Sequence, residues 1–275
     1  SWLARIPTRV GYARPWRNFF LTTTLPSPTA VKAMRKRSLA DIQTLIAENP
    51  ASPTFSRAQT GAVHQTHDYL RLVGALGANT APLAPHLAVT ETELNDARVK
   101  FGLAQNSRPI FGLNPGAEYG PAKRWPASQF IAVARELQKK TDCVWLILGG
   151  KTDIALAEEI RLAISDLPAA AQSLAGRTSL RELCAVLKLC RVVLTNDTGP
   201  MHVAAALGTP VVVPFGSTSP ELTGPGLPGD ERNFLIQSNA PCSPCFLREC
   251  PIDFRCMKGI PVETVVAAVM KAAAQ

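Results

Sequence analysis

The segment from Thr195 to Pro210 contains the residue types that bind a phosphate group. It reads TNDTGPMHVAAALGTP and directly follows a short apolar stretch. Asp197 or Thr198 can cap the helix that is expected next, with Pro200 in its first turn. Free N–H groups near Thr198 and Gly199 would then hold phosphate oxygens, with the Thr198 hydroxyl as a further donor. Because a carboxylate repels phosphate, we expect Asp197 to accept hydrogen bonds from sugar hydroxyls instead.

His202 lies one turn further along the same expected helix. A single histidine in a helix is more often a packed residue than a functional one. Its closeness to the expected anion site raises the odds of a role in binding, because histidine changes charge near neutral pH. Both interpretations stay open from the residues alone.

A second segment with related chemistry runs from Asn114 to Pro126 and reads NPGAEYGPAKRWP. Gly116 and Gly120 allow the backbone to approach a ligand closely, and the helix expected next begins with unpaired N–H groups. Lys123 adds a mobile ammonium group. The alternative is a simple turn with a surface lysine. The order strand, loop, helix favours binding, because ligands of open α/β sheets bind at the carboxyl ends of the strands.

Four of the seven cysteines form a third cluster, at Cys242, Cys245, Cys250 and Cys256. Four thiols so close in sequence could bind a zinc ion or an iron–sulfur cluster, but their spacing is not the paired CxxC pattern of zinc ribbons. Reduced thiols that pack a loop and labile disulfides are the other interpretations. A structural zinc ion is therefore one of several possible interpretations of this cluster.

The elements that position these segments alternate between strands and helices. We predict strands over 109–114, 143–148, 192–195, 211–214 and 234–236, and helices over 128–140, 154–164, 179–189, 201–207 and 262–274. The strands are continuously apolar, which is typical of a parallel sheet covered on both faces. Residues 95–275 are thus predicted to form one doubly wound α/β domain.

Residues 1–94 have a less regular pattern. Prolines such as Pro26, Pro50 and Pro82 interrupt this segment, and its clearest helix is expected over 67–76. A free-standing Rossmann-like domain would open with a strand and a phosphate-facing turn, and we find no such turn in the first ninety residues. We therefore interpret residues 1–94 as the incomplete remnant of a second domain.

The formal net charge of +8 is concentrated near the start of the chain, where residues 1–40 contain eight basic residues and no acid. This segment is either a solvated basic surface or a face that meets an acidic acceptor or an anionic membrane. No nucleic-acid-binding motif accompanies the charge, so nucleic acid is not an expected partner. The sequence shows no apolar run that could span a membrane and no secretory leader, which predicts a cytoplasmic protein.

The two phosphate-binding segments together resemble the donor-site motifs of glycosyltransferase family 9, which includes the ADP-heptose:lipopolysaccharide heptosyltransferases. The similar stretches are NPGAEYGPAKRWP and NDTGPMHVAAALGTPVVVPFGSTSP, and CSPCFLRECP with the following RCM resembles the heptosyltransferase II branch. Near the start of the chain, IPTRVGY and HDYLRLVGALG are also similar, so the resemblance covers nearly the whole sequence. It implies a GT-B fold of two facing Rossmann-like domains, the N-terminal one incomplete here.

The resemblance implies inverting transfer of heptose from ADP-L-glycero-D-manno-heptose to the acidic inner core of lipopolysaccharide, at the cytoplasmic face of the inner membrane. Lys123 matches a lysine that contacts the donor, and it would stabilise the leaving diphosphate. Asp153 or Lys151 would contact the ribose. No cofactor is required, and the absence of an Asp-x-Asp pair fits a transferase that needs no metal ion. Carried over position by position, the donor-binding residues are Glu118, Tyr119, Lys123, Asp197, Thr198, Gly199 and His202.

This sequence departs from the pattern of the family in one respect that concerns catalysis. The family's first strand and the loop that bears its proposed catalytic carboxylate align upstream of Ser1, so the resemblance implies that the general base is not in this sequence. Two alternatives to heptosyl transfer follow. The protein could be a transferase of the same fold that uses another nucleotide sugar, or a donor-binding protein without catalysis.

Overall fold

The computed structural model describes residues 2–27, 34–49, 55–57, 64–167, 171–227 and 229–275. Its main body is a seven-stranded sheet in which β3 pairs antiparallel with β9 and all other neighbours are parallel. In spatial order the strands are β3 (Phe55–Arg57), β9 (Asn233–Ser238), β8 (Val211–Phe215), β7 (Val192–Thr195), β4 (Ile110–Asn114), β5 (Val144–Ile147) and β6 (Ala171–Ser173). From β6 to β9 this is the doubly wound order of Rossmann folds.

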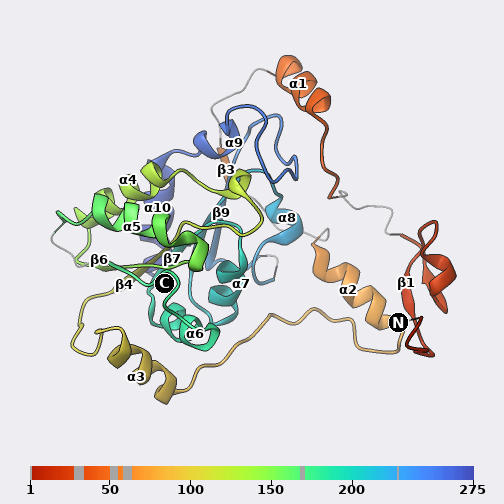
Figure 1. Cartoon of the computed structure of the whole chain (residues 1–275), viewed down its shortest axis with the longest axis horizontal. Helices are drawn as coiled ribbons and strands as arrows, with labels where there is room; N and C mark the ends of the chain where they lie inside the picture. Colours follow the sequence, from red (N-terminus) through yellow and green to blue (C-terminus); the bar gives the residue numbers. More distant parts are fainter. Residues whose placement is uncertain (1, 28–33, 50–54, 58–63, 168–170, 228) are drawn as a thin grey trace.

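Helices cover both faces of the sheet (Figure 1). One layer packs on Trp145 and Ile147, and it consists of α4 (Ala127–Gln138), α5 (Ile154–Ala163) and α10 (Val262–Ala273). The other packs on Leu146 and Leu148, and it consists of α3 (Glu91–Lys100), α6 (Leu180–Leu189) and α7 (Gly199–Ala206). Because successive side chains of β5 enter opposite cores, the strand is apolar throughout. The predicted α/β fold with a sheet covered on both faces is confirmed.

All five predicted strands and all five predicted helices of residues 95–275 are present, with ends shifted by at most about two residues. The strand β6 and the helix α3 were not predicted. The helix α3 had a readable start signal, because Thr90 and Glu93 form a capping box in which each side chain accepts from the other residue's backbone N–H. The short helices around the sheet are η2 (Pro121–Lys123), η3 (Lys151–Asp153), α8 (Pro220–Thr223) and α9 (Arg255–Lys258).

The N-terminal segments extend away from the sheet (Figure 1). They contain β1 (Val10–Tyr12) paired parallel with β2 (Thr23–Leu25), a 3-10 turn η1 (Asn18–Phe20), α1 (Leu39–Glu48) and α2 (Gln65–Gly74). The helix α2 covers most of the helix predicted over 67–76. The Tyr12 hydroxyl donates to the Asp68 carbonyl at 2.7 Å, which joins β1 to α2. None of the described helices is long and apolar enough to cross a membrane.

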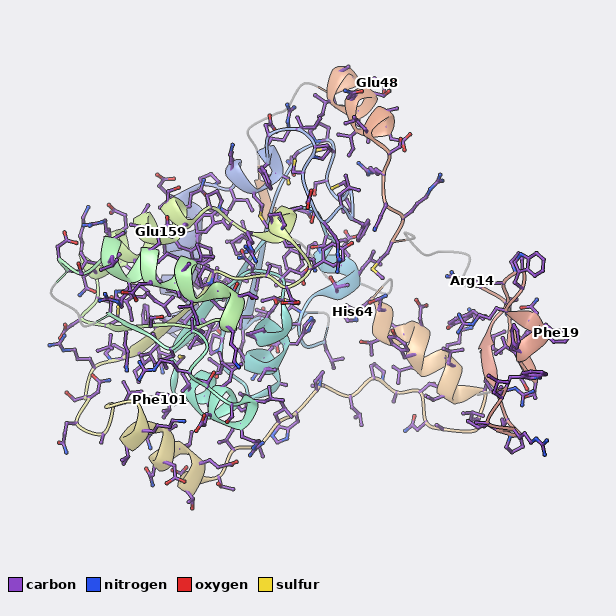
Figure 2. All side chains as sticks on the ribbon, viewed as in Figure 1. Arg14, Phe19, Glu48, His64, Phe101 and Glu159 are labelled. Atoms are coloured by element: carbon purple, nitrogen blue, oxygen red, sulfur yellow. The ribbon has the colours of Figure 1, made fainter. Side chains whose placement is uncertain are left out.

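Several N-terminal segments nevertheless attach to the main body. The strand β3 extends the sheet at β9. The buried His64 side chain, at the start of α2, lies 2.9 Å from the Gly224 carbonyl that follows α8, and Figure 2 shows it at this junction. Residues 1–94 are therefore joined to the larger unit at more than one place, and the domain boundary at residue 94 stays a prediction.

Candidate functional site

The two predicted phosphate-binding loops lie next to each other. They follow β4 and β7, which are adjacent in the sheet although β4 ends at Asn114 and β7 begins only at Val192. Asn114 and Thr195 are paired at the ends of these strands, and the Asn114 side-chain amide donates to the Thr195 hydroxyl at 3.0 Å. The order of strands reverses between β4 and β7, and such a switch point is where open α/β sheets bind ligands.

Asn196, which was not among the predicted residues, holds the two loops together. Its side chain is fully buried. The carbonyl oxygen accepts from the Trp125 backbone N–H at 3.0 Å, and the amide nitrogen donates to the Pro115 carbonyl at 2.7 Å. A buried amide needs such partners, because each unmade hydrogen bond costs about 1–3 kcal/mol. Its position directly after a buried strand was the signal that could have identified it.

Lys123 and Asp197 form an ion pair between the loops. The Lys123 ammonium is 2.7 Å from Asp197 Oδ2, and the two side chains are only 14% and 4% exposed. The Thr218 hydroxyl donates to the same carboxylate oxygen at 2.6 Å. Thr218 was also missed, because it follows β8 and nothing local to it in the sequence indicates a partner at Asp197. The three side chains bring together the loops that follow β4, β7 and β8.

The N-terminus of α7 is open to a ligand. Thr198 occupies the cap position in an extended conformation, but its side chain makes no capping hydrogen bond. Gly199 is exposed, and a Cβ atom added there would meet no other atom within 4 Å, so the first turn of the helix is accessible from solvent. A helix N-terminus with a free hydroxyl beside it provides donors and a positive dipole end for an anion.

His202 lies close enough to these groups to be affected by their charges. Desolvation by the surrounding protein is the main cause that lowers its pKa below the ordinary value of 6.5, even though the residue as a whole is exposed. The Asp197 charge opposes this shift, and the His64 and Lys123 charges add to it. The neutral imidazole is therefore favoured at neutral pH, as a hydrogen-bonding group without charge.

Tyr119 and Glu118 differ in their surroundings. The Tyr119 hydroxyl donates to the Phe246 carbonyl at 2.9 Å. The Lys123 ammonium and the Arg248 guanidinium lie 5.0 and 5.1 Å from the centre of its ring, within the range of cation–π attraction. Glu118 is exposed. Tyr119 is thus fixed beside the ion pair, whereas the Glu118 carboxylate faces solvent.

Asp153 supports the loop that contains Lys123. Its carboxylate accepts from the Gly150 backbone N–H at 2.9 Å and lies 3.7 Å from the Arg124 guanidinium. A Cβ atom at Gly116 would come within 2.4 Å of this carboxyl group, so a larger residue there would displace the Asp153 side chain. These contacts place Asp153 against the loop backbone, and a contact with ribose remains a prediction, as it does for Lys151.

The cysteine-rich segment packs against the same loop. The Arg248 carbonyl accepts from the Ala122 backbone N–H at 2.9 Å. Gly120 has φ of 151°, and a Cβ atom there would come within 2.5 Å of the Arg248 oxygen. This segment therefore fixes the backbone on both sides of Pro121 and helps to position Lys123.

The cysteines themselves are free thiols, and six of the seven are buried. Desolvation raises the pKa of Cys242 and Cys245, and that of Cys256 to about 12. Among the residues that the structure describes, no group of three or more histidine, cysteine, aspartate or glutamate side chains could hold a metal ion. The charges of Cys242, Cys245 and Cys250 add to the rise in the pKa of Cys256, so the four cysteines of the cluster lie near one another. Whether they bind zinc or pack the loop as reduced thiols stays a prediction.

Comparison with known proteins agrees with this geometry. Residues 29–254 match the model of glycosyltransferase family 9 (heptosyltransferase). Lipopolysaccharide heptosyltransferase 2 of Salmonella typhimurium is 39% identical over 144 residues, which cover 52% of this chain and 41% of that protein. Lipooligosaccharide heptosyltransferase 2 of Campylobacter jejuni is 35% identical over 166 residues, covering 60% and 51%. The chain thus spans about half the length of the curated relatives it matches.

A solved structure extends the similarity to the fold. The E. coli ADP-heptose lipopolysaccharide heptosyltransferase II superposes with a TM-score of 0.70 and 26% identity, over 99% of this chain and 71% of that one. The family model covers most of the sequence, including both loops at the switch point. The chain therefore belongs to glycosyltransferase family 9, the heptosyltransferase family.

Proposed function

We propose that this chain binds ADP-heptose at the loops after β4 and β7, and that the protein transfers the heptose to the acidic inner core of lipopolysaccharide. Family membership supports a heptosyl donor, and the similar E. coli enzyme is described as an ADP-heptose heptosyltransferase. The observation that carries the proposal is the Lys123–Asp197 pair at the switch point of the sheet. In this pair, an ammonium group that can bind the diphosphate lies beside a carboxylate that can accept hydrogen bonds from sugar hydroxyls.

The proposed donor contacts follow from the charges of the site. The diphosphate would lie at the N-terminus of α7, held by the N–H groups near Gly199 and by the Thr198 hydroxyl. The Lys123 ammonium is shared with Asp197 in this structure, and a bound phosphate would compete for it. Asp197 keeps its hydrogen bond from Thr218, which leaves its other oxygen for sugar hydroxyls. His202, Tyr119 and Glu118 complete the proposed binding surface.

The proposed reaction is a single displacement with inversion. The acceptor hydroxyl loses its proton to a general base and attacks the anomeric carbon from the face opposite ADP. The bond between that carbon and the diphosphate oxygen breaks, and ADP leaves with the electron pair. Lys123, Thr198 and the α7 N-terminus stabilise the negative charge that develops on the diphosphate. Residues of this chain supply the positive charge, so no step of this scheme calls on a metal ion.

A second candidate is a transferase of the same fold with another nucleotide sugar. The observation that favours it is that the charged and open groups of the site, Lys123, Thr198 and Gly199, suit a diphosphate rather than one particular sugar. Discrimination between sugars would depend on Asp197 and its neighbours. Comparison of transfer rates with ADP-heptose and with other nucleotide sugars decides between the two candidates. If the protein binds a donor but transfers no sugar, a binding role is favoured.

We also propose that the protein works in the cytoplasm, in peripheral contact with the inner membrane. Four arginines lie within residues 2–27, together with the aromatic side chains of Trp16 and Phe19, which are 93% and 77% exposed. Figure 2 shows Phe19 on this outlying part. Arginine and aromatic side chains together favour an anionic bilayer surface.

Calorimetric titration tests the proposed donor site. We expect the chain to bind ADP-heptose and ADP, to bind GDP less tightly, and to lose affinity for ADP-heptose more than for ADP when Asp197 is replaced by asparagine. The replacement keeps the size of the side chain and removes its charge. Replacement of the exposed Asp142, which lies away from the site, is the matched control. Equal binding of ADP and GDP, or an Asp197→Asn variant that behaves like the control, would overturn the assignment.

A further inference from the structure

A basic pocket of about 650 Å³ lies beside the candidate donor site. Arg35, Lys36 and Arg37, from the segment before α1, line one side. The other side is apolar and contains Leu222, Pro244 and Phe246. The helix α1 lies at the end of the sheet near the loops that follow β8 and β9 (Figure 1). The pocket volume falls in the range typical of small-molecule sites, about 300–1,000 Å³.

The basic segment is fixed to the main body. The Arg37 backbone N–H donates to the Cys245 carbonyl at 3.0 Å, and its guanidinium donates to the Pro241 carbonyl at 3.2 Å. Ile42 of α1 is 2% exposed and packs against Cys242 and Cys245. The backbone that carries Arg35 and Lys36 is therefore held in place before a ligand arrives, which reduces the entropy lost on binding.

The charge of the pocket is strongly positive. Three cationic side chains face one carboxylate, that of Asp41. This carboxylate accepts from the Ser38 backbone N–H at 3.1 Å as part of the α1 capping box. Hydrogen bonds with Ser38 are the main cause that lowers the pKa of Asp41. Arg35 and Lys36 are exposed, so their charged groups can reach an anion.

The pocket and the donor site share a wall. Phe246 lines the pocket, and its carbonyl accepts from the Tyr119 hydroxyl. The Phe246 backbone N–H donates to the Ser217 carbonyl at 2.7 Å. The next residue, Thr218, donates to Asp197. A ligand in the pocket would therefore lie one layer of residues away from the Lys123–Asp197 pair.

We propose that this pocket binds a sugar unit that carries a phosphate or a carboxylate. The sugar ring packs on the apolar wall, and the anionic group meets Arg35 and Lys36. Guanidinium groups suit both anions, because they form paired hydrogen bonds with them. Inorganic phosphate has no sugar ring to pack on the apolar wall, so it should bind more weakly than a sugar phosphate. Identification of the sugar as part of the acceptor rests on the proposed function, because the acceptor must lie beside the donor.

The test is an NMR titration of the ¹⁵N-labelled chain with glucose 6-phosphate, glucuronate, glucose and inorganic phosphate. We expect both anionic sugars to shift the amide signals of Arg37, Cys245 and Phe246 in a saturable manner. Glucose should cause no saturable shift. Inorganic phosphate should bind more weakly than glucose 6-phosphate. If phosphate alone matches the affinity of the sugar phosphate, the sugar-binding part of the proposal is wrong.

Two double variants test the residues. Arg35→Gln with Lys36→Gln should weaken binding of glucose 6-phosphate at least about tenfold, because it removes the charge-assisted hydrogen bonds to the anionic group. Lys139→Gln with Lys140→Gln removes the same charge from exposed positions at the end of α4, which line a different cavity. Equal weakening by both pairs would mean that overall charge, and not this pocket, attracts the ligand.

An ADP titration of the same variants separates this inference from the proposed function. Loss of sugar-phosphate binding with ADP binding intact is the expected result for the pocket variant. If the wild-type chain binds glucose 6-phosphate but not ADP, the donor assignment fails and the pocket stands. If it binds ADP and no anionic sugar shifts the three amides, the pocket proposal fails and the donor assignment stands.

Discussion

Replacement of Lys123 by methionine should reduce the stability of the protein. The Lys123 ammonium is 2.7 Å from an Asp197 carboxylate that is 4% exposed. Removal of one partner from a fully buried ion pair costs about 3–5 kcal/mol, because the other charge is left uncompensated. Thr218 still donates to the carboxylate, and Lys123 retains some contact with solvent. We therefore expect a loss of about 2–3 kcal/mol in the free energy of unfolding.

Urea unfolding followed by circular dichroism measures this loss. The double variant Lys123→Met with Asp197→Asn removes both charges, so it should be more stable than the Lys123→Met single variant, with a coupling free energy of at least about 1 kcal/mol. Lys139 is the control, because its ammonium pairs with Glu136 on the exposed face of α4. Replacement of Lys139 by methionine should change stability by less than about 0.5 kcal/mol.

The same substitution should weaken ADP binding. If the ammonium passes from Asp197 to the diphosphate, its loss removes a charge-assisted hydrogen bond and about tenfold or more in affinity. Calorimetry on the Lys123→Met and Lys139→Met variants compares the two positions directly. A Lys123→Met variant that matches the Lys139→Met variant in both stability and ADP affinity would refute the reasoning from the buried pair.

Two other predictions concern the pH response and the membrane. Because desolvation holds the pKa of His202 below 6.5, His202 favours the folded state above about pH 6.5, and this contribution is lost as pH falls through the lower folded value. NMR titration of its ring should give a midpoint below pH 6.5. In the Asp197→Asn variant the midpoint should be lower still, because the Asp197 charge that raises the His202 pKa is lost. A midpoint at or above pH 6.5 in the unchanged chain would contradict the argument from desolvation. In cosedimentation with vesicles, the chain should bind phosphatidylglycerol-containing bilayers and not pure phosphatidylcholine, and high salt should release it. Equal binding to both vesicles would exclude electrostatic attachment.

Much of the fold could be predicted from the sequence, because the signals are local. Strands such as β5 and β7 are short and continuously apolar, since both of their faces enter a core. The loops after β4 and β7 have glycine, proline and capping residues at the positions where a strand turns into a helix. The helix α3 was missed although its capping box is local, and β6 was missed because its three residues have no apolar pattern.

The site was predicted in part. Lys123 and Asp197 were named separately, each on its own loop, and the ion pair between them was not anticipated. Thr218 was missed because its role comes from a contact far away in sequence. Asn196 was missed although it directly follows a buried strand, and its partners likewise lie far away in sequence. The cysteine-rich segment was singled out by the spacing of its thiols, and its contact with the backbone around Gly120 was not anticipated.

The sequence by itself determined which segments become strands, helices and phosphate-binding loops, because periodicity, capping and glycine placement act within a few residues. Only the tertiary structure decided which loops meet. The order of strands places β4 beside β7, and this brings Lys123 within 2.7 Å of a carboxylate 74 residues later in the chain. The packing of the segment before α1 on Cys245 likewise creates the basic pocket. Such contacts depend on how several elements pack at once, and no local pattern specifies that.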